Sequence, residues 1–326
     1  MTQEIITIGA RQLIRAGFET LPAIVVDAGE RASWRFIEFF TANIRNKNTC
    51  AAYAQAVGQF FNWCDAHRIT RLEQIQPVVI STYIEELQNR RSAPTVKQHL
   101  AALKMLFDWL VIGQVVPTNP AGSVRGPKHV TKRGKTPVLK ADQARELLDS
   151  IDVSTIVGLR DRAIIALMCY TFARVSAMVK MDVEDYYQNG KRWWVRLHEK
   201  GGKRHEVPAH HNAELYLDAY IEAAGIREQK KGPLFRSVDK HRNLTLTPMT
   251  RIDVFRMVKR RAAGASLPSS TCCHTFRATG ITAYLENGGT IENAQAIAAH
   301  ESPRTTKLYD RTSDEITLDE VERIVI

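Results

Sequence analysis

The chain has 326 residues, of which 44% are hydrophobic and 25% charged, the balance of a soluble globular protein. This length suffices for two domains with separate cores. The formal net charge of +10 and an isoelectric point near 9.4 favour a polyanionic partner, either nucleic acid or an anionic membrane surface. No apolar run approaches the ~20 residues of a membrane-spanning helix. The N-terminus also lacks the apolar stretch of a signal peptide.

The five cysteines are odd in number and form no Cys-x-x-Cys pair. We therefore interpret them as reduced thiols of a cytosolic (cytoplasmic) protein. Cys272, Cys273 and His274 together look like part of a metal site, but adjacent cysteines do not easily bind one tetrahedral ion. No second ligand pair follows them. The sequence accordingly predicts no metal and no cofactor.

The first part of the chain has the periodicity of helices, after a poorly patterned extension over residues 1–30. Short connections join the apolar stripes, so residues 31–120 are predicted to form a small four-helix bundle. Thr49 and the pair Ala93 and Pro94 have the chemistry of helix starts. The stripes with helical spacing cover residues 34–44, 53–64, 79–87 and 96–110.

A basic linker follows over residues 121–138, rich in Pro and Gly and without periodicity. Between Val124 and Ala141 there are six Lys and Arg residues and no acidic one. Such a run is either a solvated linker or a linker that crosses a phosphate backbone, and both descriptions can hold together. The side chains that we assign to DNA binding are Arg125, Lys128, Lys132, Arg133 and Lys135.

A second domain is predicted over residues 139–326. Residues 191–197 and 203–208 alternate polar and apolar positions around Gly201 and Gly202, which predicts a β-hairpin. A last amphipathic segment covers residues 317–326. The remaining predicted elements are helices over residues 140–150, 159–170, 213–224, 251–263, 276–286 and 291–299.

Several polar side chains of this domain have the chemistry for breaking a phosphodiester without metal or water. Tyr309 supplies a nucleophile whose phosphotyrosyl product resembles in energy the bond that is broken, so the step can reverse. Arg174 and Arg277 carry guanidinium forks that match phosphate oxygens and stay charged. His274 lies one helical turn before Arg277 and can act as a base or as a phosphate ligand.

Two more residues complete the set. His300 can donate a further hydrogen bond to the phosphate. Lys200, at the predicted hairpin turn, can reach the leaving oxygen as general acid. Taken singly, each of the six residues also has an ordinary explanation, as a packing tyrosine, a helix-end histidine or an ion-paired cation. The alternative ion pairs are Arg174 with Asp182 or Asp185, and Lys200 with Glu199 or Glu206.

In order and spacing the six residues resemble the tyrosine recombinases, the phage integrase family. That family's pattern is an Arg, a hairpin Lys, His-x-x-Arg, a His or Trp, and a Tyr. The resemblance places the lysine at Lys200 rather than Lys203. It covers residues 139–312 by motif and the four helices before them by pattern only. The segments that carry it are YTFARVSAMVKMDVED, HEKGGKRHEVP and HTFRATGITAYLENGGTIENAQAIAAHESPRTTKLYDR.

Four positions depart from the family pattern. Ala173 replaces the usual Gly before the first arginine, and Ala177 replaces the acidic residue after it. Ala278 replaces a frequent second His, and Ala299 replaces the Gly before His300. None of these changes removes a catalytic group. The change at Ala177 predicts a less tightly braced site, with slow or partner-dependent cleavage.

The resemblance implies a mainly α fold with a small β-sheet or hairpin: a SAM-like four-helix core-binding domain, then an α+β catalytic domain. It implies a site-specific recombinase that cuts and rejoins double-stranded DNA through a 3′-phosphotyrosyl intermediate in integration, excision or resolution. The two domains would form a C-shaped clamp on DNA, and the protein would act as a homotetramer on paired sites. An accessory directionality factor is a further candidate partner, and no membrane is involved.

Three points stay open at this stage. The tail at residues 317–326 would be a helix docked either on a neighbouring protomer or on its own domain. A type IB topoisomerase would use the same chemistry and rejoin the same strand. A DNA-binding accessory protein with weak or lost catalysis would keep the basic surface without the reaction.

Overall fold

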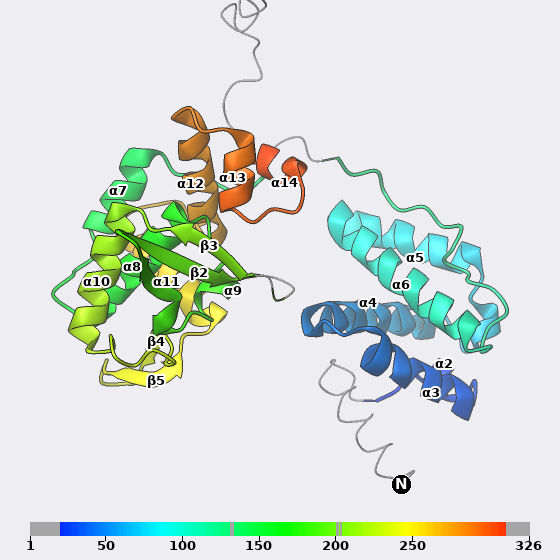
Figure 1. Cartoon of the computed structure of the whole chain (residues 1–326). Helices are drawn as coiled ribbons and strands as arrows, with labels where there is room; N and C mark the ends of the chain where they lie inside the picture. The colour runs from blue at the N-terminus through cyan, green and yellow to red at the C-terminus, as the bar shows by residue number, and fades with distance from the viewer. Residues whose placement is uncertain (1–19, 131–133, 200–201, 203, 311–326) are drawn as a thin grey trace, which may run out of the picture. The chain divides into compact units, whose positions relative to one another are not determined.

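A computed structural model describes residues 20–130, 134–199, 202 and 204–310 (Figure 1). The chain divides into two compact units between Val130 and Thr131. The described strands lie in the second unit, and even there helices contain far more residues than strands do, which confirms the predicted fold class. Over the described ranges, no helix is both long and apolar enough to cross a membrane.

The first unit is a helical bundle whose long helices match the predicted stripes. A short helix, α2, lies within the extension that showed no clear pattern in the sequence. A π-helical turn at Phe39–Asn43 continues α3, and a 3-10 turn at Leu72–Gln74 precedes α5. The helices are α2 (Ala23–Val26), α3 (Glu30–Glu38), α4 (Lys47–Ala66), α5 (Pro77–Arg90) and α6 (Ala93–Ile112).

Capping chemistry sets the start of α4. The side-chain oxygen of Asn46 accepts hydrogen bonds from the backbone N–H groups of Asn48 at 3.0 Å and Thr49 at 3.2 Å. Such a cap is worth about 1 kcal/mol. The helix therefore begins at Lys47, two residues before the predicted start at Thr49.

Aromatic rings fill the core between α3 and α4. Phe36 is fully buried, and its ring lies 6.0 Å from that of Phe61. The π-helical turn adds a residue to one turn, so the adjacent Phe39 and Phe40 both reach the core. The predicted stripe through residues 34–44 is thus only partly right, because Trp34 stays partly exposed.

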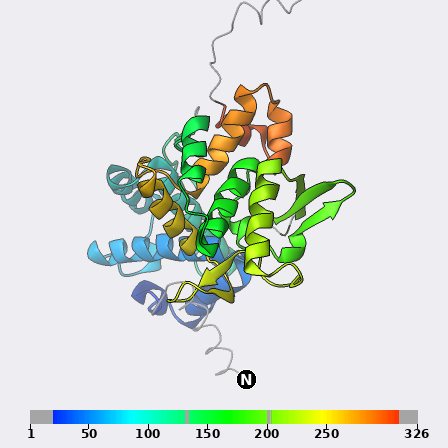
Figure 2. The same ribbon diagram turned by 90° about the vertical axis from the view of Figure 1, so that its left-hand side faces the viewer.

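The second unit is built around α8, which packs against α7, α10 and α12. Figure 2 shows α10 beside α8, with the three-stranded sheet next to it. The short helices α9 and α14 were not predicted from the sequence. The helices are α7 (Ala141–Asp149), α8 (Ile156–Tyr170), α9 (Val175–Met178), α10 (His211–Ala224), α11 (Arg251–Gly264), α12 (Cys273–Glu286), α13 (Ile291–Ile297) and α14 (Pro303–Lys307).

Two small antiparallel sheets complete this unit. The predicted hairpin is present, with Val195 opposite Val207 and both buried in the core. A second hairpin, β4 with β5, was not predicted because its strands have only three and five residues. The strands are β1 (Tyr186–Asn189), β2 (Arg192–His198), β3 (Arg204–Pro208), β4 (Arg236–Val238) and β5 (Leu244–Pro248).

Gly280 allows α12 to lie directly on the end of α8. A Cβ atom at this position would lie 2.0 Å from the carbonyl oxygen of Cys169 and 2.9 Å from the ring of Phe172. Backbone cannot move away as a flexible side chain can, so only a hydrogen atom fits here. This contact fixes the helix that carries His274 and Arg277.

We predict that Gly280→Ala lowers the free energy of unfolding by about 2–3 kcal/mol, because overpacking forces α12 away from α8. Urea denaturation followed by circular dichroism measures this. Gly264→Ala is the matched control, since a Cβ there meets nothing within 4 Å. Alanine exceeds glycine in helix propensity by up to ~1 kcal/mol, so the control should be no less stable than wild type. Equal denaturation midpoints for Gly280→Ala and wild type would contradict the prediction.

Candidate active site

Helix α12 carries three groups of the site along its length. His274 and Arg277 lie one turn apart near its start, as the sequence predicted. Farther along, the hydroxyl of Thr282 donates a hydrogen bond to the backbone carbonyl of Tyr309 at 2.8 Å. One helix therefore fixes both the side chains of the site and the backbone of the candidate nucleophile.

The phenol of Tyr309 contacts the imidazole of His274. Its oxygen lies 2.7 Å from Nε2 of His274, while the tyrosine as a whole is only 6% exposed. Partial burial of the imidazole lowers the pKa of His274, and the positive charges of Arg277 and Arg174 lower it further. A neutral imidazole can accept the phenol proton through Nε2, which is the chemistry of a general base.

Arg277 is almost completely buried, with 1% of its surface exposed. Its Nη1 donates to the backbone carbonyl of Phe172, and its Nη2 donates to that of Ala298 at 2.7 Å. Burial and the charge of Arg174 lower the pKa of Arg277 to about 10, so the group stays charged at neutral pH. Its Nε is buried without a hydrogen-bond partner among the described residues, which leaves one N–H for an acceptor such as a phosphate oxygen.

His300 links Arg277 to the nucleophile. Its Nε2 lies 2.6 Å from Nη2 of Arg277 and its Nδ1 lies 2.9 Å from the hydroxyl of Thr306. Because a guanidinium only donates, Nε2 must accept and Nδ1 must carry the proton. The imidazole also stacks on the ring of Tyr309, with centroids 5.8 Å apart. To donate to a phosphate, as the sequence suggested, His300 would have to give up one of these bonds.

Arg174 precedes α9 and pairs with a carboxylate that the sequence did not assign to it. Its Nη1 lies 2.5 Å from Oε2 of Glu199, which is 6% exposed. The alternative pairing with Asp182 or Asp185 is not found. Instead, Asp185 contacts His198 at 2.9 Å and Arg196 at 3.6 Å. Arg174 is therefore held by a carboxylate that follows β2, whereas the alanine at position 177 has no acidic group to pair with it.

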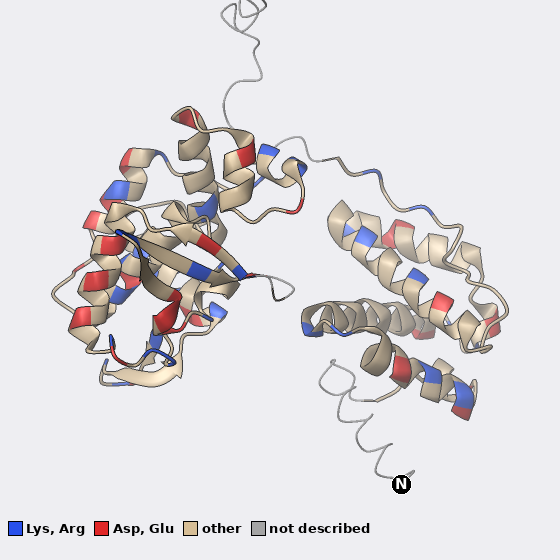
Figure 3. Ribbon diagram, viewed as in Figure 1, with Lys and Arg blue, Asp and Glu red and all other residues tan. Residues whose placement is uncertain are grey.

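The basic residues of the prediction are only partly described. Lys200 lies outside the described residues, as do Lys132, Arg133 and the tail at residues 317–326. Arg125, Lys128 and Lys135 are described and exposed. Figure 3 shows Lys and Arg positions along the coil that follows α6. Their contact with DNA stays a prediction.

Two residues beside Arg277 have left-handed backbone conformations without being glycine. Phe172 has φ of 53° and Ala299 has φ of 47°. The sequence placed the missing glycine at Ala173, but the left-handed residue is Phe172. Such a conformation costs about 1–2 kcal/mol in a residue with a Cβ atom. In both places it lies at or next to a carbonyl that accepts from Arg277.

Sequence reasoning missed three side chains of this cluster. Thr282 and Thr306 belong to no motif, because each contributes only a hydroxyl that is aligned by tertiary packing. Glu199 was noticed only as a neighbour of Lys200 in the chain. No local pattern points to its contact with Arg174, which lies 25 residues earlier.

Family models match both units of the chain. The phage integrase family model matches residues 137–315, and the model of the phage integrase N-terminal SAM-like domain matches residues 35–113. The chain belongs to the phage integrase family, the tyrosine recombinases. This membership confirms the resemblance that the six residues suggested.

Curated relatives of this family member cover most of its length. It is 26% identical to tyrosine recombinase XerD of Staphylococcus aureus over 269 residues, which are 82% of this chain and 89% of that protein. It is 27% identical to tyrosine recombinase XerD of Listeria innocua over 265 residues, 80% of this chain and 87% of that protein.

Solved structures of other recombinases share the fold. XerH bound to a palindromic difH substrate, in a post-cleavage complex, matches with a TM-score of 0.66 at 16% identity, over 97% of this chain and 93% of that one. A lambda integrase tetramer bound to a Holliday junction matches with a TM-score of 0.65 at 18% identity, over 95% of this chain and 88% of that one.

The acid stability of this recombinase family member should depend on His300. Burial, then the charges of Arg277 and Arg174, lower the pKa of His300 from 6.5 to about 3. As the pH falls through 6.5, the unfolded chain binds a proton that the folded chain rejects, so folded-state stability is lost progressively toward pH 3. The limiting slope for one such group is about 1.4 kcal/mol per pH unit.

We therefore predict that the free energy of unfolding falls more steeply for wild type than for His300→Gln between about pH 6.5 and 5. Glutamine can still accept from Arg277 but does not titrate. Urea denaturation at a series of pH values gives both slopes. Parallel slopes would show that His300 is not the group responsible.

Ala299→Gly should stabilise the protein by about 0.5–1 kcal/mol, because glycine adopts the left-handed conformation without strain. The control is Ala298→Gly, at a residue with φ of −79°. There glycine adds freedom to the unfolded chain and also removes a buried methyl group, so about 1–2 kcal/mol should be lost. Thermal denaturation separates the two cases, and losses of equal size in both variants would refute the assignment of strain to residue 299.

Proposed function

We propose that this chain is a site-specific DNA recombinase that cleaves double-stranded DNA with Tyr309 and rejoins it to another strand. The observation that carries the proposal is the clustering of a nucleophile, a general base and a hydrogen-bond donor for the phosphate. The phenol oxygen of Tyr309 lies 2.7 Å from His274, and its ring stacks on the imidazole that holds Arg277. The Nε of Arg277 has no hydrogen-bond partner among the described residues, and we assign it to a phosphate oxygen that reaches it when the side chains around this buried atom move apart.

The cleavage step follows from these groups. His274 takes the phenol proton, and the phenol oxygen of Tyr309 attacks phosphorus. A bond to the 3′-phosphate forms as the bond to the 5′ oxygen breaks. Arg277 and the exposed part of Arg174 hold the non-bridging oxygens as negative charge grows. Lys200 is assigned, by resemblance to the family, the proton that the departing 5′ oxygen takes up.

The second half of the reaction reverses the first. The phosphotyrosyl bond keeps the energy of the bond that was broken, so a free 5′-hydroxyl can displace Tyr309. Attack by the hydroxyl of another strand gives recombination, whereas attack by the original hydroxyl only restores the substrate. His274 returns the proton to the phenol in this step, by microscopic reversibility.

We assign the chain double-stranded DNA as its substrate and a homotetramer on paired sites as its working form, in the cytoplasm. Support comes from the net charge of +10 and from solved relatives with the same fold, whose complexes include a tetramer on a Holliday junction. The exposed Arg125, Lys128 and Lys135 are our candidates for backbone contacts in the linker. A directionality factor is proposed as an accessory partner for one direction of the reaction.

A covalent-trapping experiment tests the nucleophile. The substrate is a pool of nicked duplexes with a randomised segment around the nick, from which the freed fragment diffuses away after cleavage. Wild type should form a protein–DNA adduct that survives detergent, and sequencing the trapped DNA identifies the site. Tyr309→Phe should form none, because the attacking oxygen is gone.

Tyr284→Phe is the matched control, since Tyr284 lies on α12 and packs near Phe172 without contacting His274 or Arg277 in any described bond. This variant should trap DNA as wild type does. An adduct with Tyr309→Phe would overturn the assignment of Tyr309. Trapped DNA without sequence enrichment, together with relaxation of supercoiled plasmid, would favour a topoisomerase.

A further inference from the structure

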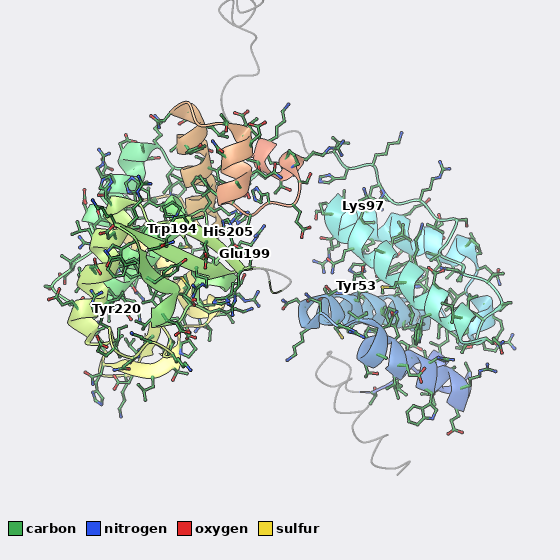
Figure 4. All side chains as sticks on the ribbon, viewed as in Figure 1. Tyr53, Lys97, Trp194, Glu199, His205 and Tyr220 are labelled. Carbon is green, nitrogen blue, oxygen red and sulfur yellow. The ribbon has the colours of Figure 1, made fainter. Side chains whose placement is uncertain are left out.

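A buried carboxylate lies beside the exposed arginine of the site. Glu199 is 6% exposed, and its Oε2 lies 2.5 Å from Nη1 of Arg174, whose side chain keeps 35% of its surface exposed. The carboxylate thus occupies one side of the guanidinium fork while the arginine still meets solvent. Figure 4 shows Glu199 where β2 ends, near His205 of the adjacent strand β3.

This contact joins two segments that are far apart in sequence. Arg174 lies at the start of α9, and Glu199 directly follows the last residue of β2. At that end of the sheet, His198 of β2 is paired with Arg204 of β3. The backbone of Glu199 therefore directly adjoins a paired strand, which limits where its carboxylate can lie relative to the guanidinium.

Glu199 also changes the charge balance of the site. Arg174 and Arg277 are both positive, and Arg174 lowers the pKa of Arg277. Glu199 acts in the opposite sense and raises the pKa of Arg277. Its negative charge therefore offsets the repulsion between two cations that must converge on one phosphate.

Stability alone gives little reason for a carboxylate at this position. A buried ion pair gains Coulomb energy but loses the hydration of both charges, so an uncharged residue of similar shape is often as stable. A pair that adds little to stability can still set the orientation of Arg174.

We propose that Glu199 is a positioning residue that holds the guanidinium of Arg174 in the orientation that binds the scissile phosphate. This inference rests on the proposed recombinase function and extends it to a residue outside the six that were first recognised. Glu199 does not touch the substrate and acts through Arg174. Its negative charge near the phosphate opposes DNA binding, while the ordered fork favours the transition state.

The two effects predict a split between binding and chemistry. Glu199→Gln keeps the shape and can still accept from Nη1, but it lacks the charge that holds the fork. The variant should bind DNA as tightly as wild type or tighter. Its single-turnover cleavage rate at saturating protein should fall about 10–100-fold, the range typical of residues that orient a catalytic group. Its melting temperature should stay at the wild-type value. Glutamine is neutral, and the charge of Arg174 is partly exposed to solvent, so no buried charge is left unpaired.

The experiment uses the nicked duplex recovered from the trapping selection and the full-length chain. Glu206→Gln is the matched control, because Glu206 lies in β3 of the same sheet and pairs with Arg196 at 2.7 Å on the exposed surface. It should cleave at the wild-type rate. Glu199→Asp keeps the charge on a shorter side chain and should recover part of the loss.

A double-variant cycle decides whether Glu199 acts through Arg174. Lysine at position 174 has no fork to orient, so adding Glu199→Gln to Arg174→Lys should slow cleavage by less than about threefold. The full 10–100-fold loss in that background would overturn the proposal, as would a wild-type rate for Glu199→Gln alone. If wild type itself formed no protein–DNA adduct, the recombinase function would be refuted instead.

Discussion

The buried guanidinium of Arg277 is the group on which the catalytic unit depends. A charge removed from water costs several kcal/mol unless hydrogen bonds replace its hydration. Here the replacements are the carbonyls of Phe172 and Ala298 and the imidazole of His300. These acceptors follow α8 and α13, so Arg277 on α12 is satisfied only when all three helices are packed together. The packing that forms the core therefore also brings together the hydrogen bonds of the site.

The same arrangement explains why the site tolerates local strain. Phe172 and Ala299 lie in the left-handed region, where a side chain with a Cβ atom is disfavoured. Each helps to aim a carbonyl at Arg277, and the bonds to a buried cation outweigh a backbone cost of about 1–2 kcal/mol. Strain of this kind persists only where the surrounding structure fixes the backbone.

Local patterns in the sequence were enough to predict most of the helices and part of the site. His274 and Arg277 share a face because three residues make nearly one helical turn, which needs no tertiary information. The partner of Arg174 was not predictable, because the sequence offered Asp182 and Asp185 and only the folded sheet brings Glu199 to the guanidinium. The proton position on His300 likewise depends on two contacts that form after folding.

Other elements escaped prediction for equally physical reasons. The strands β4 and β5 have only three and five residues, so the alternation of Leu244 and Leu246 with threonines in β5 is too short to mark a strand. The π-helical turn at Phe39–Asn43 breaks the spacing on which a helical stripe is recognised. Both cases show that periodicity identifies regular, amphipathic elements of several turns or strand residues and misses irregular or very short ones.

The spacing of His274 and Thr282 along α12 limits where the length of this chain can change. Inserting or deleting a single residue there would turn everything beyond it by roughly 100° about the helix axis. The threonine that tethers the backbone of Tyr309 would then face away from the tyrosine while the histidine stayed in place. Length changes must therefore fall outside this stretch, for example in the exposed turn between β4 and β5, where no group of the site would lose its alignment.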